Sequence, residues 1–458
     1  MRFEKAGKSE ASVVCSSRCR RGAESRPDDH YMREILSIFA FPVYVIMFLV
    51  LYYQVFLLIS FFDTLKGRRR AEAALKEISK LSKDAPSVMV MVPCYNEEET
   101  VIPTIESLLN LNYPGDKLNI LVIDDGSTDR TYKLVEDYIK SHPEHSGLSV
   151  ITKPNGGKHS ALNLGLEYAK TDLVGCLDAD SFADPDSLRE IVKYFEDEKV
   201  MAVTPGIKVY EPKTMFQHMQ KAEYAMGIFL RQALSTLDGI HVTPGPLSIF
   251  RRSVFENLGG YRRAHNTEDL EIALRMHRNG YRIVNAEKAF VYTVTPRTFG
   301  QLLKQRVRWS QGFLRNIYEY RDLLFSRRQG NLGMLVLPMS ALSVFSAVYI
   351  FIIAIATAAT SAAEKISELQ LTGLHFQPAA FKFSWFVFSA NWMVFVMYAL
   401  TLTALAFSIL GRKIADGKIN LLSRDLWFFT FIYGLVAPIW LSKAAYEALM
   451  RRQNKWKA

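Results

Sequence analysis

The chain has 458 residues, a formal net charge of +10, 49% hydrophobic residues and 22% charged residues. This composition excludes an intrinsically disordered protein, and the length gives room for one large domain or two ordinary ones. The positive charge comes mainly from basic clusters beside long apolar stretches, so it does not indicate a nucleic-acid-binding protein.

Four stretches of the sequence are long and apolar enough to cross a bilayer, which takes about 20 residues. The sequence predicts transmembrane helices over residues 34–63, 332–360, 383–410 and 426–447. The uncharged part of the fourth is short, and the long side chain of Lys443 extends it by reaching towards the interface. Uncharged runs of this length are not typical of buried core helices.

Basic clusters beside these stretches indicate which side of the membrane each loop occupies, because they favour the cytoplasm. They predict that residues 64–331 and the loop 411–425 are cytoplasmic and that the loop 361–382 is extracytoplasmic. The predicted location is the cell membrane, with several spans and the large polar region inside.

Both ends of the chain fit this topology poorly. The tail 448–458 is basic, and the N-terminal tail 1–33 has seven basic residues before Met32. The N-terminal tail has no apolar core, so it is not a signal peptide. We expect translation to start at Met32, which would remove the conflict at that end.

Residues 64–86 are predicted to be a charged juxtamembrane linker, after which short β-branched runs begin. The predicted strands are 87–92, 118–124, 148–153 and 172–178, and helical patterns such as 98–110 and 128–142 lie between them. Strands that alternate with helices predict a mostly parallel sheet with helices on both faces. Sites in such sheets lie at the carboxyl ends of the strands.

Two cysteines, Cys94 and Cys176, fall within this region. They have no zinc-ligand spacing, and a disulfide is not expected in a reducing compartment. We interpret both as small apolar fillers.

Polar and acidic segments follow each predicted strand: PCYNEEE (93–99), DDGSTD (124–129), KPNGGKHSALN (153–163) and DADS (178–181). A solvated loop explains any one of them, but four in order, each after an apolar run, favour a site. Asp178 and Asp180 stand two positions apart at a strand end, where they can share a hard cation such as Mg²⁺ or Mn²⁺.

A further acidic segment, Thr267, Glu268 and Asp269, begins a predicted helix within 265–281. Thr267 is the expected N-cap, and acids favour the positive end of the helix dipole. That structural interpretation competes with a catalytic one, because an acid held at a helix start beside a cleft is well placed as a general base.

Taken together, the motifs PCYNEE, DDGST, NGGKHSALN, DAD, TED and QRVRW resemble those of the processive family 2 glycosyltransferases. These are the synthases of cellulose, chitin, hyaluronan and poly-N-acetylglucosamine and the related chitooligosaccharide synthases. The resemblance covers residues 87–320. It implies a GT-A-type nucleotide-sugar-binding domain over 87–295, followed by amphipathic interface helices over 296–331, with one transmembrane helix before and three after.

The resemblance also implies a role for each motif residue. The donor nucleotide sugar would be bound by Pro93, Tyr95, Glu97, Asp125, Lys158, Asp178, Gln305 and Arg308. Asp178 and Asp180 would hold Mg²⁺ or Mn²⁺, and Asp269, beside Glu268, would be the general base. Trp309 would stack on the acceptor sugar.

Two neighbouring assignments depend on weaker signals. The loop TPGPLSIFRR (243–252) resembles the acceptor-side loop of the family, so Gly245 and Pro246 are expected to bind the acceptor, although an ordinary turn is the alternative. Arg306 fills a variable position of QRVRW, and we expect it to meet lipid headgroups.

The implied function is an inverting β-glycosyltransferase that polymerises a UDP-sugar, preferably UDP-N-acetylglucosamine, into an exported glycan. Its partners would be the donor, a growing glycan or lipid acceptor, the bilayer and accessory export subunits, and not nucleic acid. Two alternatives remain: a single transfer to a lipid phosphate, and a non-catalytic scaffold or exporter. Polar residues inside the spans, among them Gln54 and Asn391, indicate either helix–helix hydrogen bonds or a lining for the exported chain.

Overall fold

The structure, a computed structural model, describes residues 41–65, 85–372, 392–418 and 423–450. The chain divides into two compact units. Of the described residues, 41–47 and 349–372 belong to the smaller unit, which is helical, and the others to the larger unit. The predictions for the tails 1–33 and 448–458, for most of the linker 64–86 and for Asn391 fall largely or wholly outside the described residues.

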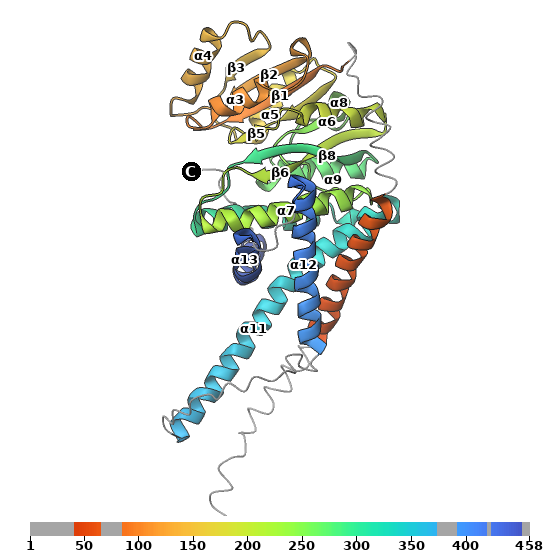
Figure 1. Ribbon diagram of the computed structural model, residues 1–458, viewed down its shortest axis with the longest axis vertical. Helices are drawn as coiled ribbons and strands as arrows, with labels where there is room; N and C mark the ends of the chain where they lie inside the picture. Colours follow the sequence, from red (N-terminus) through yellow and green to blue (C-terminus); the bar gives the residue numbers. More distant parts are fainter. Residues whose placement is uncertain (1–40, 66–84, 373–391, 419–422, 451–458) are drawn as a thin grey trace, which may run out of the picture. The chain divides into compact units, whose positions relative to one another are not determined.

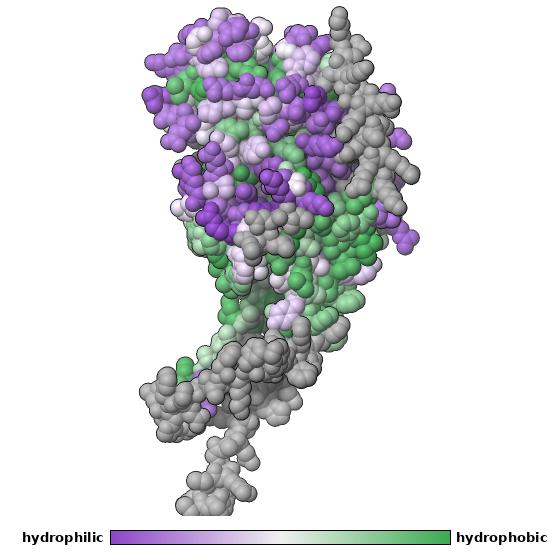
Figure 2. Space-filling view, in the orientation of Figure 1, coloured by the Kyte–Doolittle hydropathy of each residue, from purple (hydrophilic) through white to green (hydrophobic). Residues whose placement is uncertain are grey.

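The described residues contain four helices long and apolar enough to cross a membrane: Phe41–Leu65, Leu332–Gln370, Val394–Asp416 and Arg424–Leu449. In the larger unit, Figure 2 shows hydrophobic residues gathered over the long apolar helices and hydrophilic residues over the domain that contains the sheet. One helix precedes the sheet domain and three follow it, which confirms the predicted arrangement.

Two of these helices end later in the sequence than predicted. α11 (Leu337–Thr372) continues through the first half of the predicted loop 361–382, and α12 (Trp392–Asp416) continues into the predicted loop 411–425. The sequence SAAEKISELQ (361–370) explains the first extension, because it consists largely of good helix formers. The last helix contains a π-helical turn and is described as α13 (Arg424–Phe428), η8 (Phe429–Tyr433) and α14 (Gly434–Leu449).

The centre of the larger unit is an eight-stranded sheet with the order β3-β2-β1-β4-β7-β6-β8-β5 (Figure 1). Its strands are β1 (Val88–Cys94), β2 (Leu118–Asp124), β3 (Leu148–Thr152), β4 (Leu173–Cys176), β5 (Ser181–Ala183), β6 (Val200–Val209), β7 (Ser248–Arg251) and β8 (Arg282–Thr293). The four predicted strands are β1 to β4, and they pair in parallel.

The other half of the sheet contains strands in both directions. β6 pairs in parallel with β8, whereas β7 runs antiparallel to both β4 and β6, and β5 runs antiparallel to β8. Strand–helix alternation in the sequence does not predict these strands, because antiparallel neighbours need no helical crossover between them. The GT-A fold itself is confirmed.

Helices cover both faces of the sheet, and each face has its own core. On one face, Val88, Val90 and Val92 pack with α3 (Val101–Leu109), α4 (Thr131–Ser141) and α6 (Ser187–Val192). On the other, Met89 and Met91 pack with α5 (Lys158–Tyr168), α8 (Arg252–Leu258) and α9 (Glu268–Arg278). β1 is buried at every position, as expected for a strand covered on both sides.

Two long helices join the sheet to the membrane helices within the larger unit. α7 (Met215–Ser235) buries Phe229 against Leu57 and Phe407, and α10 (Phe299–Glu319) buries Val307 against Trp440. Both begin with a capping box, in which a threonine and a glutamine satisfy each other's backbone N–H groups. The QRVRW motif therefore lies on a helix packed against the last membrane helix.

Candidate active site

The strand register brings the polar motifs to one edge of the sheet. In the parallel pairing, Cys94 is opposite Asp124, and Met91 is opposite Cys176. The segments that follow β1, β2 and β4 therefore leave the sheet side by side, where α5 also begins. This is the edge at which α/β sheets bind ligands.

The first two motifs form interlocked turns. The Asn96 N–H donates to Ser127 Oγ at 3.0 Å, and the Glu97 N–H donates to Thr131 Oγ1 at 2.8 Å. Asn96 has a φ of 54°, in the left-handed region. The predicted donor residues Pro93, Tyr95 and Glu97 thus lie at the end of β1 and in the turn that follows it.

Asp125 is buried and already has three donors. It accepts hydrogen bonds from the N–H groups of Gly156 and Gly157, at 3.0 and 2.7 Å, and from Lys153 Nζ at 2.7 Å. Gly157 has a φ of 87°, which favours glycine at this turn. Asp125 therefore holds the NGGKH loop against the end of β2 and fixes the start of α5.

Lys158 is the first residue of α5 and lies between two carboxylates. Its Nζ is 2.5 Å from Asp178 Oδ1 and 3.4 Å from Glu268 Oε1. Burial disfavours the ammonium ion, but Asp178 and Glu268 outweigh it and raise the pKa of Lys158. The lysine therefore stays charged and links the DAD and TED motifs.

The loop that contains Gly245 and Pro246 lies against this group. A β-carbon at Gly245 would lie 2.5 Å from Lys158 Nζ and 2.7 Å from Asp178 Oδ2, so any larger residue would displace the charged ends of these two side chains. The Cys176 thiol donates to the Gly245 carbonyl at 3.0 Å, and burial raises the pKa of that thiol to about 12. Cys176 is thus more than an apolar filler.

The TED motif begins α9, with Thr267 at the expected N-cap position. The Thr267 hydroxyl caps no helical N–H, however, and instead donates to the Ala264 carbonyl at 2.9 Å. The preceding residues 264–266 have φ values of 40°, 58° and 64°. Consecutive non-glycine residues in this region are strained, and such strain clusters at functional sites.

Asp269 follows this strained turn in the sequence, as the second residue of α9. Its backbone carbonyl accepts from both the N–H and the hydroxyl of Thr243, at 3.1 and 2.9 Å. Burial, followed by the neighbouring Glu268 carboxylate, raises the pKa of Asp269 to about 6. The side chain therefore takes up a proton more readily than an ordinary aspartate.

α10 carries QRVRW and touches the TED turn directly. A β-carbon at Gly312 would collide with the Thr267 side chain, and Asn316 Nδ2 donates to Thr267 Oγ1 at 2.9 Å. Arg308 is close enough to Asp269 to lower its pKa, although burial and Glu268 dominate. Gln305 has a buried side-chain oxygen with no hydrogen-bond partner within the described residues.

The expectation for Arg306 is wrong. Its side chain is only 7% exposed, and Nη2 lies 2.7 Å from Glu223 Oε2, so it does not meet lipid headgroups. Its partner lies 83 residues earlier on α7, which the spacing of QRVRW does not reveal. Trp309 is 37% exposed and lies one turn further along α10.

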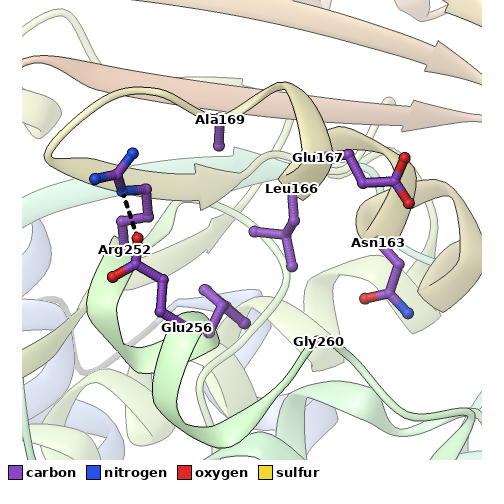
Figure 3. Close-up of a pocket in the computed structure, with 8 residues that line it drawn as sticks. Asn163, Leu166, Glu167, Ala169, Arg252, Glu256 and Gly260 are labelled. Carbon is purple, nitrogen blue, oxygen red and sulfur yellow. Dashed lines mark ion pairs between the residues drawn. The ribbon is translucent and has the colours of Figure 1, made fainter.

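One hollow is bordered by the last residues of two motif segments, Asn163 of NGGKHSALN and Arg252 of TPGPLSIFRR. It has a volume of about 380 Å³ and is lined from α5 and α8, including Asn163, Leu166, Arg252 and Glu256 (Figure 3). Arg252 Nε and Glu256 Oε1, one turn apart on α8, form an ion pair at 3.1 Å on one side of it (Figure 3). None of the predicted site residues lines it.

Comparison with known proteins agrees with the motifs. Residues 89–259 match the family described as "Glycosyl transferase family 2". A poly-beta-1,6-N-acetyl-D-glucosamine synthase of Staphylococcus epidermidis is 30% identical over 279 residues, which cover 60% of this chain and 66% of that protein. A synthase of the same name from Staphylococcus aureus is 34% identical over 227 residues, covering 49% and 54%.

The alignments with these two relatives span about two thirds and about half of their own lengths. A second S. epidermidis synthase of that name is 28% identical, over 79% of this chain and 83% of its own. Among solved structures, the mannosyltransferase PcManGT from Pyrobaculum calidifontis, in complex with GDP-Man and Mn²⁺, has a TM-score of 0.55 at 22% identity and covers 88% of this chain and 99% of its own. That likeness concerns the fold. The chain therefore belongs to the processive family 2 glycosyltransferases that its motifs resemble.

Proposed function

We propose that this glycosyltransferase polymerises a UDP-sugar, preferably UDP-N-acetylglucosamine, with inversion at the anomeric carbon, and exports the product between its own helices. One observation supports this most directly: α10 touches the TED turn through Gly312 and packs against membrane helix α14 through Val307. In this proposal, α10 would therefore contact both the acceptor and the route by which the glycan crosses the membrane. The names of the synthase relatives support the choice of sugar.

The divalent cation would be held by Asp178 and Asp180. The residues fit it, because the Asp178 side chain is 31% exposed and the missing β-carbon of Gly245 keeps the approach to its carboxylate open. Two carboxylates with substrate phosphates are a common set of ligands for Mg²⁺ and Mn²⁺. When bound, the cation would neutralise charge on the departing diphosphate.

Asp269 would accept the proton of the acceptor hydroxyl while that oxygen attacks the anomeric carbon and UDP departs from the opposite side. Its raised pKa of about 6 lies nearer to neutral pH than that of an ordinary aspartate, which suits a general base. Burial, followed by Glu268, raises that pKa, and the Glu268 carboxylate lies 3.4 Å from Lys158 Nζ. Lys158 would thereby fix the position of Asp178, which binds the donor, relative to Glu268 and the adjacent base Asp269.

The remaining roles are assigned by motif. The donor would contact Pro93, Tyr95, Glu97, Asp125, Lys158, Gln305 and Arg308, and the acceptor would contact Trp309, Gly245 and Pro246. Arg308 would face the departing diphosphate, because guanidinium groups bind phosphate oxygens well. The basic clusters favour a cytoplasmic sheet domain in the cell membrane, with the bilayer and accessory export subunits as partners.

A direct test is UDP release by the purified full-length protein, with a panel of UDP-sugars and with digestion of the product by linkage-specific hydrolases. We expect turnover with UDP-N-acetylglucosamine and a product of many sugars. A product with one sugar on a lipid phosphate would favour the single-transfer alternative. A protein that binds but never hydrolyses or transfers any of these donors would favour the scaffold.

A further inference from the structure

A buried charged group links three elements beside Trp309. Arg306 on α10 pairs with Glu223 on α7, with 2.7 Å between Nη2 and Oε2. The Tyr433 hydroxyl donates to the other carboxylate oxygen, Oε1, at 3.1 Å. The Arg306 and Glu223 side chains are 7% and 14% exposed, so this is an interior ion pair rather than a surface one.

The same guanidinium covers one face of the Trp309 ring. Arg306 Cζ lies 4.4 Å from the ring centroid, within the range of a cation–π contact. Trp309 is nevertheless 37% exposed, so part of the ring remains open. An aromatic side chain that stacks on a sugar needs a fixed ring orientation. Arg306 restricts the orientation of the Trp309 ring, because its guanidinium group lies against one face of that ring.

The third member comes from the last membrane helix. Tyr433 ends the π-helical turn Phe429–Tyr433, and its ring packs on Phe429 at 4.9 Å and edge-on to Trp440 at 5.4 Å between centroids. Single π-helical turns inside α-helices are frequent at functional sites. This turn inserts an extra residue into the helix at the position from which Tyr433 reaches Glu223.

The buried Arg306–Glu223 ion pair limits which substitutions can test its role. Burial raises the pKa of Glu223, and Arg306 opposes that shift. Breaking a buried ion pair leaves one charge without its partner, which is strongly destabilising. A truncation to alanine would therefore confuse a functional role with a folding defect, whereas Glu223→Gln, Arg306→Lys and Tyr433→Phe keep the size of each side chain.

We propose that Glu223 is a positioning residue for the acceptor: it fixes Arg306, Arg306 fixes the plane of the Trp309 ring, and Tyr433 fixes Glu223 from the membrane helix. The proposal rests on the proposed function, in which Trp309 binds the acceptor sugar. It assigns to α7 and to the π-helical turn a part in acceptor binding that the QRVRW motif alone does not indicate.

The test uses the full-length protein in detergent, with UDP-N-acetylglucosamine as donor and a short N-acetylglucosamine oligomer as acceptor. We expect Glu223→Gln and Arg306→Lys to raise the half-saturating oligomer concentration about tenfold, with the donor KM unchanged. Tyr433→Phe, which removes one hydrogen bond and leaves the ion pair intact, should raise it about threefold. The milder variant keeps the test informative where the stronger ones fold poorly.

A double mutant separates positioning from simple structural support. In a Trp309→Ala protein, Glu223→Gln should change the oligomer dependence no further, because its effect passes through the ring. Asp425→Asn is the matched control: the Asp425 side chain is also buried, at 8% exposed, and it pairs with His218 of the same α7 at 2.7 Å. It should lower thermal stability without altering the oligomer dependence.

The outcomes that overturn the proposal are distinct from failure of the proposed function. Equal changes in donor KM and oligomer dependence, or full additivity with Trp309→Ala, would show that Glu223 only supports the fold. If the unaltered protein turns over no UDP-sugar in any condition, the proposed function fails first and the positioning role with it.

Discussion

The Gly245 α-carbon faces the Asp178 carboxylate so closely that a β-carbon there would lie 2.7 Å from Oδ2. The same atom would lie 2.5 Å from Lys158 Nζ, so it would press on both members of the ion pair that joins DAD to α5. The Gly245 loop therefore packs directly against the Asp178–Lys158 ion pair.

Gly245→Ala should reduce kcat/KM by about 100-fold, because a shift of about 1 Å at reacting groups costs that much. The measurement is the rate of UDP release as a function of donor concentration, including concentrations well below KM. Gly115→Ala is the control, since a β-carbon there meets nothing within 4 Å. Normal turnover by the Gly245 variant would place the loop outside the site.

The pH dependence of turnover should report on Asp269. Its pKa is raised to about 6, first by burial and then by Glu268. A general base acts only when deprotonated, so activity is present above that pKa and is lost as the pH falls through it. We expect kcat/KM to be level above about pH 7 and to fall about tenfold per pH unit below about 6.

Asp269→Asn is the companion variant, and it should abolish transfer while UDP still binds. A kcat/KM profile that stays flat down to about pH 5, or a turnover that survives in Asp269→Asn, would assign the base to another group.

Local signals explain which parts of this fold are predictable. β1 to β4 are short apolar runs between amphipathic helices, so their parallel pairing follows from alternation alone. β7 is not predictable in that way, because its antiparallel place between β4 and β6 depends on partners distant in the sequence. Arg306 illustrates the same limit for a side chain: its basic, aromatic surroundings indicate a membrane surface, while its actual partner, Glu223, lies on another helix.

The contact between Gly312 and Thr267 sets how closely QRVRW approaches the TED turn. Gly312→Ala would push α10 away from Thr267 and should lower kcat by about 100-fold. Gly300→Ala, on the same helix in open space, is the matched control and should change little. Equal activity in the two variants would mean that the spacing between α10 and α9 is not critical.

Metal binding should depend on the nucleotide. Among the described residues, no group of three or more His, Cys, Asp or Glu side chains is arranged to hold a cation, and Asp178 already pairs with Lys158. In the proposed site, the diphosphate would supply further ligands beside Asp178 and Asp180. We expect Mn²⁺, followed by electron paramagnetic resonance, to bind weakly alone and at least tenfold more tightly with UDP, and UDP to gain equally from Mn²⁺. Tight binding of Mn²⁺ without UDP would contradict this account.

Variants of Gln54 and Thr403 can distinguish the two interpretations of polar residues in the spans: helix–helix hydrogen bonding and a lining for the exported glycan. The Thr403 hydroxyl donates to Gln54 Oε1, so these two helices of the larger unit are joined by a hydrogen bond. If this bond is the only role of Gln54, then Gln54→Leu and Thr403→Val should each lower stability by about 0.6 kcal/mol, the average for such bonds in membranes. Both variants should then release UDP and export product like the unaltered protein. If Gln54 also lines the path of the glycan, Gln54→Leu should reduce product outside reconstituted vesicles far more than UDP release, while Thr403→Val leaves their ratio unchanged.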